Sequence, residues 1–185
     1  AGEAIVALGL TEPRGGSDAA NLQLKARRVG DEYVLSGEKT SITFADQADA
    51  MVLFARTGKP EDVARGISAF LVDKGTPGFN VLRRIPMLGG QFTYEVALEN
   101  CRVPAANLLG VEGQGFAPMQ VRLSTRRLQM ASWSIGMAQR ALDMMLEYAP
   151  QRVVFGEPLA NRQAIQWWIA DAYTKIKAAT LMTYE

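Results

Sequence analysis

The first 109 residues alternate between apolar and polar positions in short runs separated by Gly, Pro, Asn and Asp. Alternation with a period of two is typical of strands that bury one face, and the residues between the runs are turn formers. Gly30 and Asp31 lie between two such runs and predict a hairpin. The runs that predict strands are residues 4–10, 22–29, 32–39, 50–57, 66–73, 79–85 and 94–103. With no helical pattern between them, they predict an all-β barrel or sandwich.

A helical pattern replaces this alternation from residue 116. Residues 116–148 are rich in Ala, Leu, Met, Gln and Arg, and after the first turn only Gly136 interrupts them. This composition predicts one long helix, which Pro150 should end or kink. From about Leu159 onward, apolar residues recur at steps of three and four, so we expect a second helix with an apolar stripe. The stripe consists of Ile165, Ile169, Ala172, Ile176 and Ala179.

The two predicted helices are each about 40 Å long at 1.5 Å per residue. A pair of this length cannot close a compact domain, so we expect further helices from additional chain, from other subunits, or from both. The change of pattern falls within residues 103–118. It predicts two domains, residues 1–110 and residues 111–185.

Composition narrows the class of protein. The 185 residues are 48% hydrophobic and carry a formal net charge of +1, as in ordinary globular proteins with a real core. Basic and acidic residues are interspersed, so nothing favours nucleic-acid binding. No apolar stretch reaches about 18 residues, and no basic segment precedes an apolar one at the start. We therefore expect neither an integral membrane segment nor a visible targeting signal.

A single cysteine and the absence of histidine exclude several chemistries. Cys101 alone cannot form an internal disulfide or a multi-cysteine metal site. Without histidine, neither a Ser-His-Asp triad nor a His-ligated zinc or haem can be built. We expect no metal site, and Cys101 is expected to be a small buried hydrophobic residue. The remaining chemistry must rest on carboxylates, hydroxyls, arginines or a cofactor.

Five stretches of the chain resemble motifs of the acyl-CoA dehydrogenase family, in family order and spacing. They are LTEPRGGSD (10–18), GDEYVLSGEKTSIT (30–43), VPAANLLGVEGQGF (103–116), GMAQRALD (136–143) and RVVFGEPLANRQAI (152–165). The resemblance implies an antiparallel β-barrel domain followed by long antiparallel helices of an incomplete up-and-down four-helix bundle. It also implies that the chain is a segment of a protein about twice as long.

The stretch TEPRGGSD, residues 11–18, has two interpretations. Pro, Gly and Asp form turns, and most such clusters on barrels are only turns; the small residues would also let the backbone approach a ligand. The resemblance favours a ligand. It implies that Leu10 and Thr11 lie against the ring of FAD, with Thr11 bonded to the pyrimidine side, and that Ser17 binds the flavin diphosphate or the neighbouring acyl-CoA. Glu12 is interpreted as shaping the loop.

The stretch KTSIT, residues 39–43, could be an ordinary strand end, where a threonine needs no explanation. The resemblance instead implies that Thr43 faces the N5 region of the flavin. Ser41 stands where the family commonly has a tryptophan stacked on the flavin edge. Its absence leaves open how this face of the ring is shielded and which redox partner is used.

Arg152 and Phe155 could be an exposed cation and a core aromatic residue in a connection between helices. The resemblance implies that Arg152 binds the flavin diphosphate of a neighbouring subunit, a role that suits a guanidinium. Phe155 belongs to the same cofactor-binding motif, and Gln163 would approach the adenosine half. These roles imply a homo-oligomer, a dimer or tetramer, whose FAD sites are shared between subunits.

The cluster STRR, residues 124–127, could be a solvated basic face of the first helix. The resemblance instead implies that Leu123 and Ser124 lie near the thioester end and pantetheine of acyl-CoA, with Arg127 beneath the active site. Arg126 occupies the position where the isovaleryl type carries its catalytic glutamate. We therefore predict no catalytic residue in this segment, with the base downstream of Glu185, and expect the segment alone to be inactive.

The leading hypothesis is an FAD-dependent acyl-CoA dehydrogenase. It would desaturate an acyl-CoA at the α and β carbons, transfer hydride to flavin N5, and pass electrons to an electron-transferring flavoprotein. Its location would be the bacterial cytoplasm or the mitochondrial matrix. The same fold also supports acyl-CoA oxidases and flavin monooxygenases, an alternative that Ser41 keeps open. A further alternative is a non-catalytic paralogue that acts in assembly.

Overall fold

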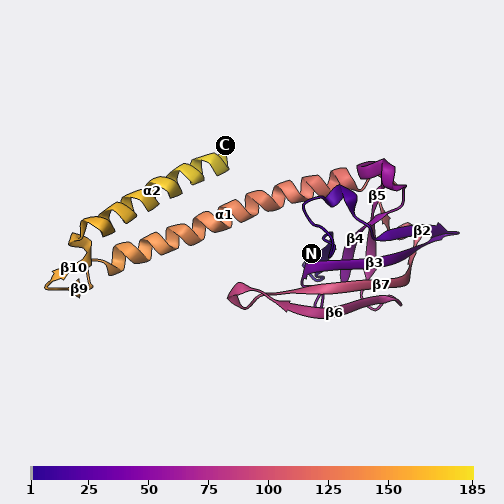
Figure 1. The fold of residues 1–185 in the computed structure, drawn as a ribbon, viewed down its shortest axis with the longest axis horizontal. Helices are drawn as coiled ribbons and strands as arrows, with labels where there is room; N and C mark the ends of the chain where they lie inside the picture. Colours follow the sequence, from indigo (N-terminus) through magenta and orange to yellow (C-terminus); the bar gives the residue numbers. More distant parts are fainter. Residues whose placement is uncertain (1) are drawn as a thin grey trace. The chain divides into compact units, whose positions relative to one another are not determined.

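A β-rich region followed by two long helices makes up the computed structural model, which describes residues 2–185 (Figure 1). This arrangement confirms the predicted fold class. The chain divides into two compact units, unit 1 through Gln120 and unit 2 from Val121 to Glu185. The division falls inside the long first helix, α1.

Unit 1 is built on one eight-stranded sheet. Its strands are β1 (Val6–Gly9), β2 (Lys25–Val29), β3 (Glu32–Thr43), β4 (Ala50–Arg56), β5 (Ile67–Asp73), β6 (Phe79–Pro86), β7 (Phe92–Pro104) and β8 (Leu108–Leu109). Short 3-10 helices lie at Ala19–Asn21, Pro60–Gly66, Leu88–Gly90 and Ala105–Asn107. Seven of these strands follow the order β6-β7-β3-β2-β4-β5-β8, and β1 pairs with β4.

Most neighbouring strands are antiparallel, but β4 pairs in parallel with both β1 and β2. The order runs along an open path from β6 to β8, and within residues 2–185 no strand pair closes it into a barrel. The predicted hairpin at Gly30 is present as the β2–β3 turn. Gly30 has a positive φ of 61°, a conformation that glycine adopts without steric cost.

The core of unit 1 lies against this sheet. Tyr33 and Phe70 are fully buried, and their ring centroids are 4.8 Å apart. Cys101 is also completely buried, as predicted, and burial raises the pKa of its thiol. Alternating strand positions supply most of this core, which explains why the period-two pattern located the longer strands.

Unit 2 contains most of α1 (Phe116–Tyr148), a small hairpin and α2 (Gln163–Tyr184). The hairpin strands are β9 (Val153–Val154) and β10 (Glu157–Pro158), followed by a 3-10 helix at Leu159–Asn161. The chain reverses at this hairpin, so α2 runs in the opposite direction to α1 (Figure 1). The first helix has the predicted bounds, whereas the second begins four residues later than predicted because the 3-10 helix precedes it.

The helices of unit 2 expose many large apolar side chains. Leu142 and Ala149 are buried, but Trp133, Trp167 and Trp168 are all more than half exposed. Within the described part of the chain, neither helix is long and apolar enough to cross a membrane.

Candidate functional site

The loop that follows β1 folds into a tight turn. The backbone N–H of Glu12 donates to the carbonyl of Gly15, and the N–H of Gly15 donates to the carbonyl of Glu12, both at 3.1 Å. Gly16 follows at a crowded point, because a Cβ added there would lie 3.2 Å from Thr11 Cγ2. The loop therefore folds closely over Thr11, and the absence of a side chain at Gly16 permits this approach.

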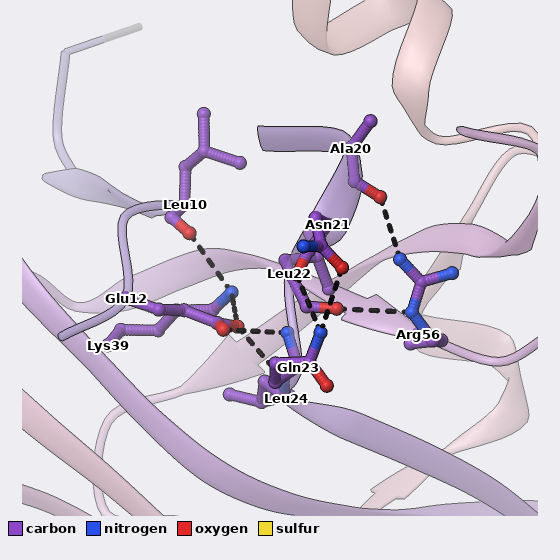
Figure 2. Close-up of polar contacts among 9 residues, drawn as sticks. All are labelled: Leu10, Glu12, Ala20, Asn21, Leu22, Gln23, Leu24, Lys39 and Arg56. Carbon is purple, nitrogen blue, oxygen red and sulfur yellow. Dashed lines mark hydrogen bonds and ion pairs between the residues drawn. The ribbon is translucent and has the colours of Figure 1, made fainter. Parts of the chain in front are cut away.

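A buried ion pair joins this loop to β3 (Figure 2). Lys39 Nζ lies 2.8 Å from Glu12 Oε1, with Lys39 completely buried and Glu12 7% exposed. The same ammonium donates to the carbonyl of Leu10 at 3.1 Å. Burial lowers the pKa of Lys39, and the attraction of the Glu12 carboxylate opposes this effect.

The Glu12 carboxylate has further partners in the segment that precedes β2. The backbone N–H of Gln23 donates to Oε2 at 2.6 Å, and the N–H of Leu24 donates to Oε1 at 2.9 Å. Together with Lys39, these donors engage both carboxylate oxygens. Charge-assisted bonds of this kind are shorter and stronger than bonds between neutral groups. Glu12 therefore shapes the loop, as its place in the sequence suggested.

Arg56 holds the same segment from the other side (Figure 2). Its Nη2 donates to the carbonyl of Ala20 at 2.7 Å, and its Nε donates to the carbonyl of Leu22 at 3.1 Å. Arg56 is 7% exposed, so these carbonyls replace much of the hydration of its guanidinium. The segment between the loop and β2 is thus fixed by one buried carboxylate, that of Glu12, and one buried cation, that of Arg56.

Backbone bonding also ties Thr11 to β3. The N–H of Thr40 donates to the carbonyl of Thr11 at 2.8 Å. The next residue, Ser41, is exposed, has a positive φ of 59°, and lies within an irregularity of the β3–β7 ladder between Lys39 and Ile42. The structure therefore brings Leu10 and Thr11 alongside the end of β3 that carries Ser41 and Thr43.

The predicted site residues of unit 1 differ in exposure. Leu10 is buried, Thr11 is half-buried, and Ser41 and Thr43 are exposed. Ser17 is also exposed. A hollow of about 350 Å³ lies against this loop. Its lining is Leu10, Glu12, Arg14, Gly15, Gly16, Asp18, Ala19, Asn21, Leu22 and Gln23.

In unit 2, the three predicted cofactor-binding residues surround the β9–β10 hairpin. Phe155 and Gly156 connect the two strands, and both have positive φ, 53° and 80°. Positive φ at both central residues defines a type I′ turn, in which a phenylalanine is unusual. Phe155 is 95% exposed at the tip. Arg152 precedes the hairpin and Gln163 begins α2, both with exposed side chains.

The predicted substrate-binding residues lie at the other end of α1 within unit 2. Ser124 and Arg127 are exposed and Leu123 is half-buried. The helix continues for 21 residues from Arg127 to Tyr148, a separation of roughly 30 Å at 1.5 Å per residue. Within this unit, the predicted substrate residues and the hairpin residues are therefore not brought together.

The roles of Lys39 and Arg56 were not predicted from the sequence. A signal for Lys39 was available, because it continues the odd-numbered positions of β3 that carry the buried residues Tyr33 and Leu35. A lysine at an inward-facing strand position needs a partner, and Glu12 is that partner. No comparable signal marks Arg56, which binds backbone carbonyls only.

Two family models match the chain. Residues 7–101 match "Acyl-CoA dehydrogenase, middle domain" and residues 113–185 match "Acyl-CoA dehydrogenase, C-terminal domain". Cyclohex-1-ene-1-carbonyl-CoA dehydrogenase of Geobacter metallireducens is 42% identical over 181 residues, which cover 97% of this chain and 47% of that protein. An acyl-CoA dehydrogenase of Bacillus subtilis is 42% identical over 185 residues, covering 99% of this chain and 48% of that protein.

Solved structures share the fold. A probable acyl-CoA dehydrogenase from Mycobacterium abscessus superposes with a TM-score of 0.94 at 39% identity, covering 99% of this chain and 49% of the other. The structure described as PigA with FAD and proline superposes with a TM-score of 0.94 at 34% identity, covering 99% of this chain and 48% of PigA. The chain thus spans about half the length of the relatives it matches.

Proposed function

This chain belongs to the acyl-CoA dehydrogenase family of flavoprotein oxidoreductases, and we propose that the whole protein binds FAD and desaturates an acyl-CoA thioester. The observation that carries the proposal is the attachment of Leu10 and Thr11 to β3, next to Ser41 and Thr43. These four residues from separated stretches of sequence are the ones that family resemblance assigns to the flavin ring. Their proximity supports a shared role.

The residues of unit 1 fit a flavin ring. Thr11, Ser41 and Thr43 carry hydroxyls that can donate to or accept from the heteroatoms of the ring. Within residues 2–185, the backbone N–H of Thr11 has no protein acceptor and is available to a ligand. Thr93, which pairs with Thr43 in the sheet, has a buried hydroxyl oxygen without a partner in the same residues. The PigA relative, whose structure contains FAD, supports the same cofactor.

When bound, FAD would supply the hydride acceptor of the reaction. The residues of this chain would bind and orient it, Thr11 at the pyrimidine side and Thr43 near N5. In unit 2, Arg152 would bind the diphosphate oxygens of the FAD in a neighbouring subunit. Phe155 belongs to the same cofactor-binding motif, and Gln163 would approach the adenosine half of FAD. A guanidinium offers paired donors that match phosphate geometry. Leu123, Ser124 and Arg127 would contact the acyl-CoA.

The proton-abstracting base is proposed to lie downstream of this segment. Glu12 does not suit the role, because its two carboxylate oxygens already accept bonds from Gln23, Leu24 and Lys39. A general base must reach the substrate with a free oxygen. The segment alone would therefore be inactive. A carboxylate elsewhere in the whole protein would remove the α-hydrogen of the substrate as a proton.

An electron-transferring flavoprotein is the proposed electron acceptor, and a dimer or tetramer the proposed assembly. Subunit CarC of the caffeyl-CoA reductase–Etf complex of Acetobacterium woodii is 41% identical over 185 residues, which supports the acceptor. We keep the bacterial cytoplasm or the mitochondrial matrix as the proposed location. An isovaleryl-CoA dehydrogenase of Pongo abelii described as mitochondrial is 38% identical over 186 residues.

A second candidate, oxidase or monooxygenase chemistry with dioxygen, is favoured by one observation. Ser41 is small and exposed where an aromatic screen would otherwise cover the ring edge. The prolyl acyl carrier protein oxidase AnaB, 30% identical, shares the fold with a TM-score of 0.92. A third candidate, a non-catalytic paralogue used in assembly, would need no flavin.

Purification of the whole protein tests all three candidates. A yellow protein that acyl-CoA bleaches without oxygen, and that an electron-transferring flavoprotein reoxidises faster than air, is the expected result. Rapid reoxidation by air alone would favour the oxidase or monooxygenase. A colourless oligomer that takes up no FAD would overturn both enzymatic proposals.

A further inference from the structure

Two consecutive residues of β3 donate hydrogen bonds to the carbonyls of Leu10 and Thr11. Lys39 Nζ donates to the carbonyl of Leu10, and the backbone N–H of Thr40 donates to the carbonyl of Thr11. The N–H of Thr11 is the other end of the peptide group whose carbonyl Lys39 contacts. It has no protein acceptor within residues 2–185.

A donor at one end of a peptide group affects the other end. An ammonium on a carbonyl oxygen draws electron density toward it, and chains of hydrogen bonds strengthen one another in this way. The effect is larger inside a protein than in water, and this ammonium is completely buried. The N–H of Thr11 is therefore a stronger donor with Lys39 in place than without it.

Stability alone does not account for a charged pair at this position. Removing two charges from water costs free energy, and proteins with neutral residues of similar volume in place of a buried ion pair are often equally stable or more stable. Glu12 nevertheless places its carboxylate among three donors, one of which is Lys39. The arrangement fixes the ammonium at one point, 2.8 Å from Glu12 Oε1 and 3.1 Å from the carbonyl of Leu10.

We propose that Glu12 and Lys39 are positioning residues for the flavin: the pair fixes the Leu10–Thr11 peptide and strengthens the Thr11 N–H as a donor to the pyrimidine side of the ring. This inference rests on the proposed function, because it requires a flavin beside Thr11. It adds two residues that affect the cofactor only through the Leu10–Thr11 peptide, without contacting it. A stronger donor at the pyrimidine side stabilises the reduced, more negative ring, so the pair also raises the flavin reduction potential.

Three variants of the whole FAD-loaded protein separate positioning from stability. Lys39→Met removes the ammonium and leaves the buried Glu12 carboxylate without its cation, so it lowers the midpoint of thermal unfolding. The double variant Lys39→Met with Glu12→Gln removes both charges and recovers part of that loss. Val72→Ala, a truncation of a fully buried residue in β5, provides a matched loss of stability with no change in polar groups near the loop.

The flavin measurements are made below the unfolding transition of each variant. We expect both Lys39 variants to bind FAD roughly threefold to tenfold more weakly, as for loss of about one hydrogen bond. They should also show a lower flavin reduction potential and a shifted absorption band, while Val72→Ala resembles the wild type in all three. Recovery of stability without recovery of the flavin properties in the double variant would support positioning.

The opposite pattern would overturn the inference. If the double variant recovers the wild-type potential and spectrum along with its stability, the pair is only structural. If Val72→Ala shifts the flavin as much as Lys39→Met does, the effect follows from general loosening. A wild-type protein that holds no FAD would instead refute the proposed function itself, so the two failures are distinguishable.

Discussion

Glu12 and Lys39 place two opposite charges in the interior of unit 1, and each depends on the other. Loss of one partner from a buried pair costs about 3–5 kcal/mol, because the remaining charge stays desolvated. Arg56 differs, since its guanidinium is balanced by carbonyl dipoles from Ala20, Leu22, Lys59 and Val63 rather than by a carboxylate. At the scale of single residues, the candidate site is thus organised by buried cations that contact backbone.

Ser41 should be under local backbone strain, which a pair of substitutions can measure. Its φ of 59° lies in the left-handed region, which costs a non-glycine residue about 1–2 kcal/mol. Glycine removes that cost but loses about 0.5–1 kcal/mol through the greater freedom of the unfolded chain. We expect Ser41→Gly to be more stable than Ser41→Ala by about 0.5–1 kcal/mol in denaturant unfolding. Equal stability of the two variants would show that the strain is relieved elsewhere.

Tyr33 should give stability a specific dependence on alkaline pH. Its hydroxyl donates to Glu112 Oε2 at 2.6 Å. Burial, followed by the bond to Glu112, raises the pKa of Tyr33 above its ordinary value of 10.0. The folded protein then keeps this proton to higher pH than the unfolded chain does. The contribution of Tyr33 is therefore complete below pH 10.0 and lost as pH rises toward the folded-state pKa.

Comparison of Tyr33→Phe with the wild type isolates this contribution from other titrating groups. At pH 8 the substitution should cost about 1 kcal/mol, the usual contribution of one hydrogen bond. Above pH 10 the cost should shrink, because the wild type alone loses its Tyr33 contribution. Urea unfolding at pH 8 and pH 10.5 provides the measurement, and a cost that does not change with pH would contradict the assignment.

At the scale of elements, the sequence pattern predicted the longer strands, the β2–β3 hairpin and the bounds of α1. These elements form from local signals, namely alternation, a Gly-Asp turn and an uninterrupted run of helix formers. The two-residue strands β8, β9 and β10 and the parallel pairs of β4 were not predicted, since partners distant in sequence determine them. For the same reason the pattern identified the loop at residues 11–18 but not Lys39, which anchors it, or Arg56, which holds the segment after it.

The β9–β10 hairpin provides a test in which FAD binding should weaken without a loss of stability. Asparagine suits the first central position of a type I′ turn better than phenylalanine does. Phe155→Asn should therefore keep or improve the stability of the hairpin. If the exposed ring contacts FAD in the assembled protein, its loss should weaken FAD binding roughly tenfold or more, from the burial of an aromatic side chain.

Titration of the whole apoprotein with FAD measures this affinity, and thermal unfolding measures stability. Val153→Thr is the matched control, because it changes an exposed position of the same hairpin and leaves the turn intact. Unchanged FAD affinity in Phe155→Asn would remove Phe155 from the proposed cofactor site.

At the scale of the whole molecule, the two units differ in how much of their own apolar surface they bury. The main apolar core lies entirely in unit 1, from Ala7 to Val103. In unit 2, within the described residues, the large apolar side chains of the helices are mostly exposed. They include Leu128, Trp133, Met137, Met144, Leu146, Trp167, Trp168, Leu181 and Met182. So much exposed apolar surface on two helices is typical of a surface that contacts other protein.

This difference predicts separate behaviour for the two units when each is produced alone. Residues 1–120 contain a continuous core and a complete sheet path, so we expect a cooperative thermal transition in circular dichroism at 218 nm, a wavelength typical of strands. Residues 121–185 bury little beyond Leu142 and Ala149 and should melt without cooperativity or self-associate. Light scattering distinguishes these last two outcomes.

Residues 1–120 should nevertheless bind FAD weakly, because Arg152 and Phe155 belong to residues 121–185. Broad melting of residues 1–120 would mean that the sheet depends on unit 2 for its stability, and tight FAD binding by residues 1–120 alone would remove the hairpin from the cofactor site.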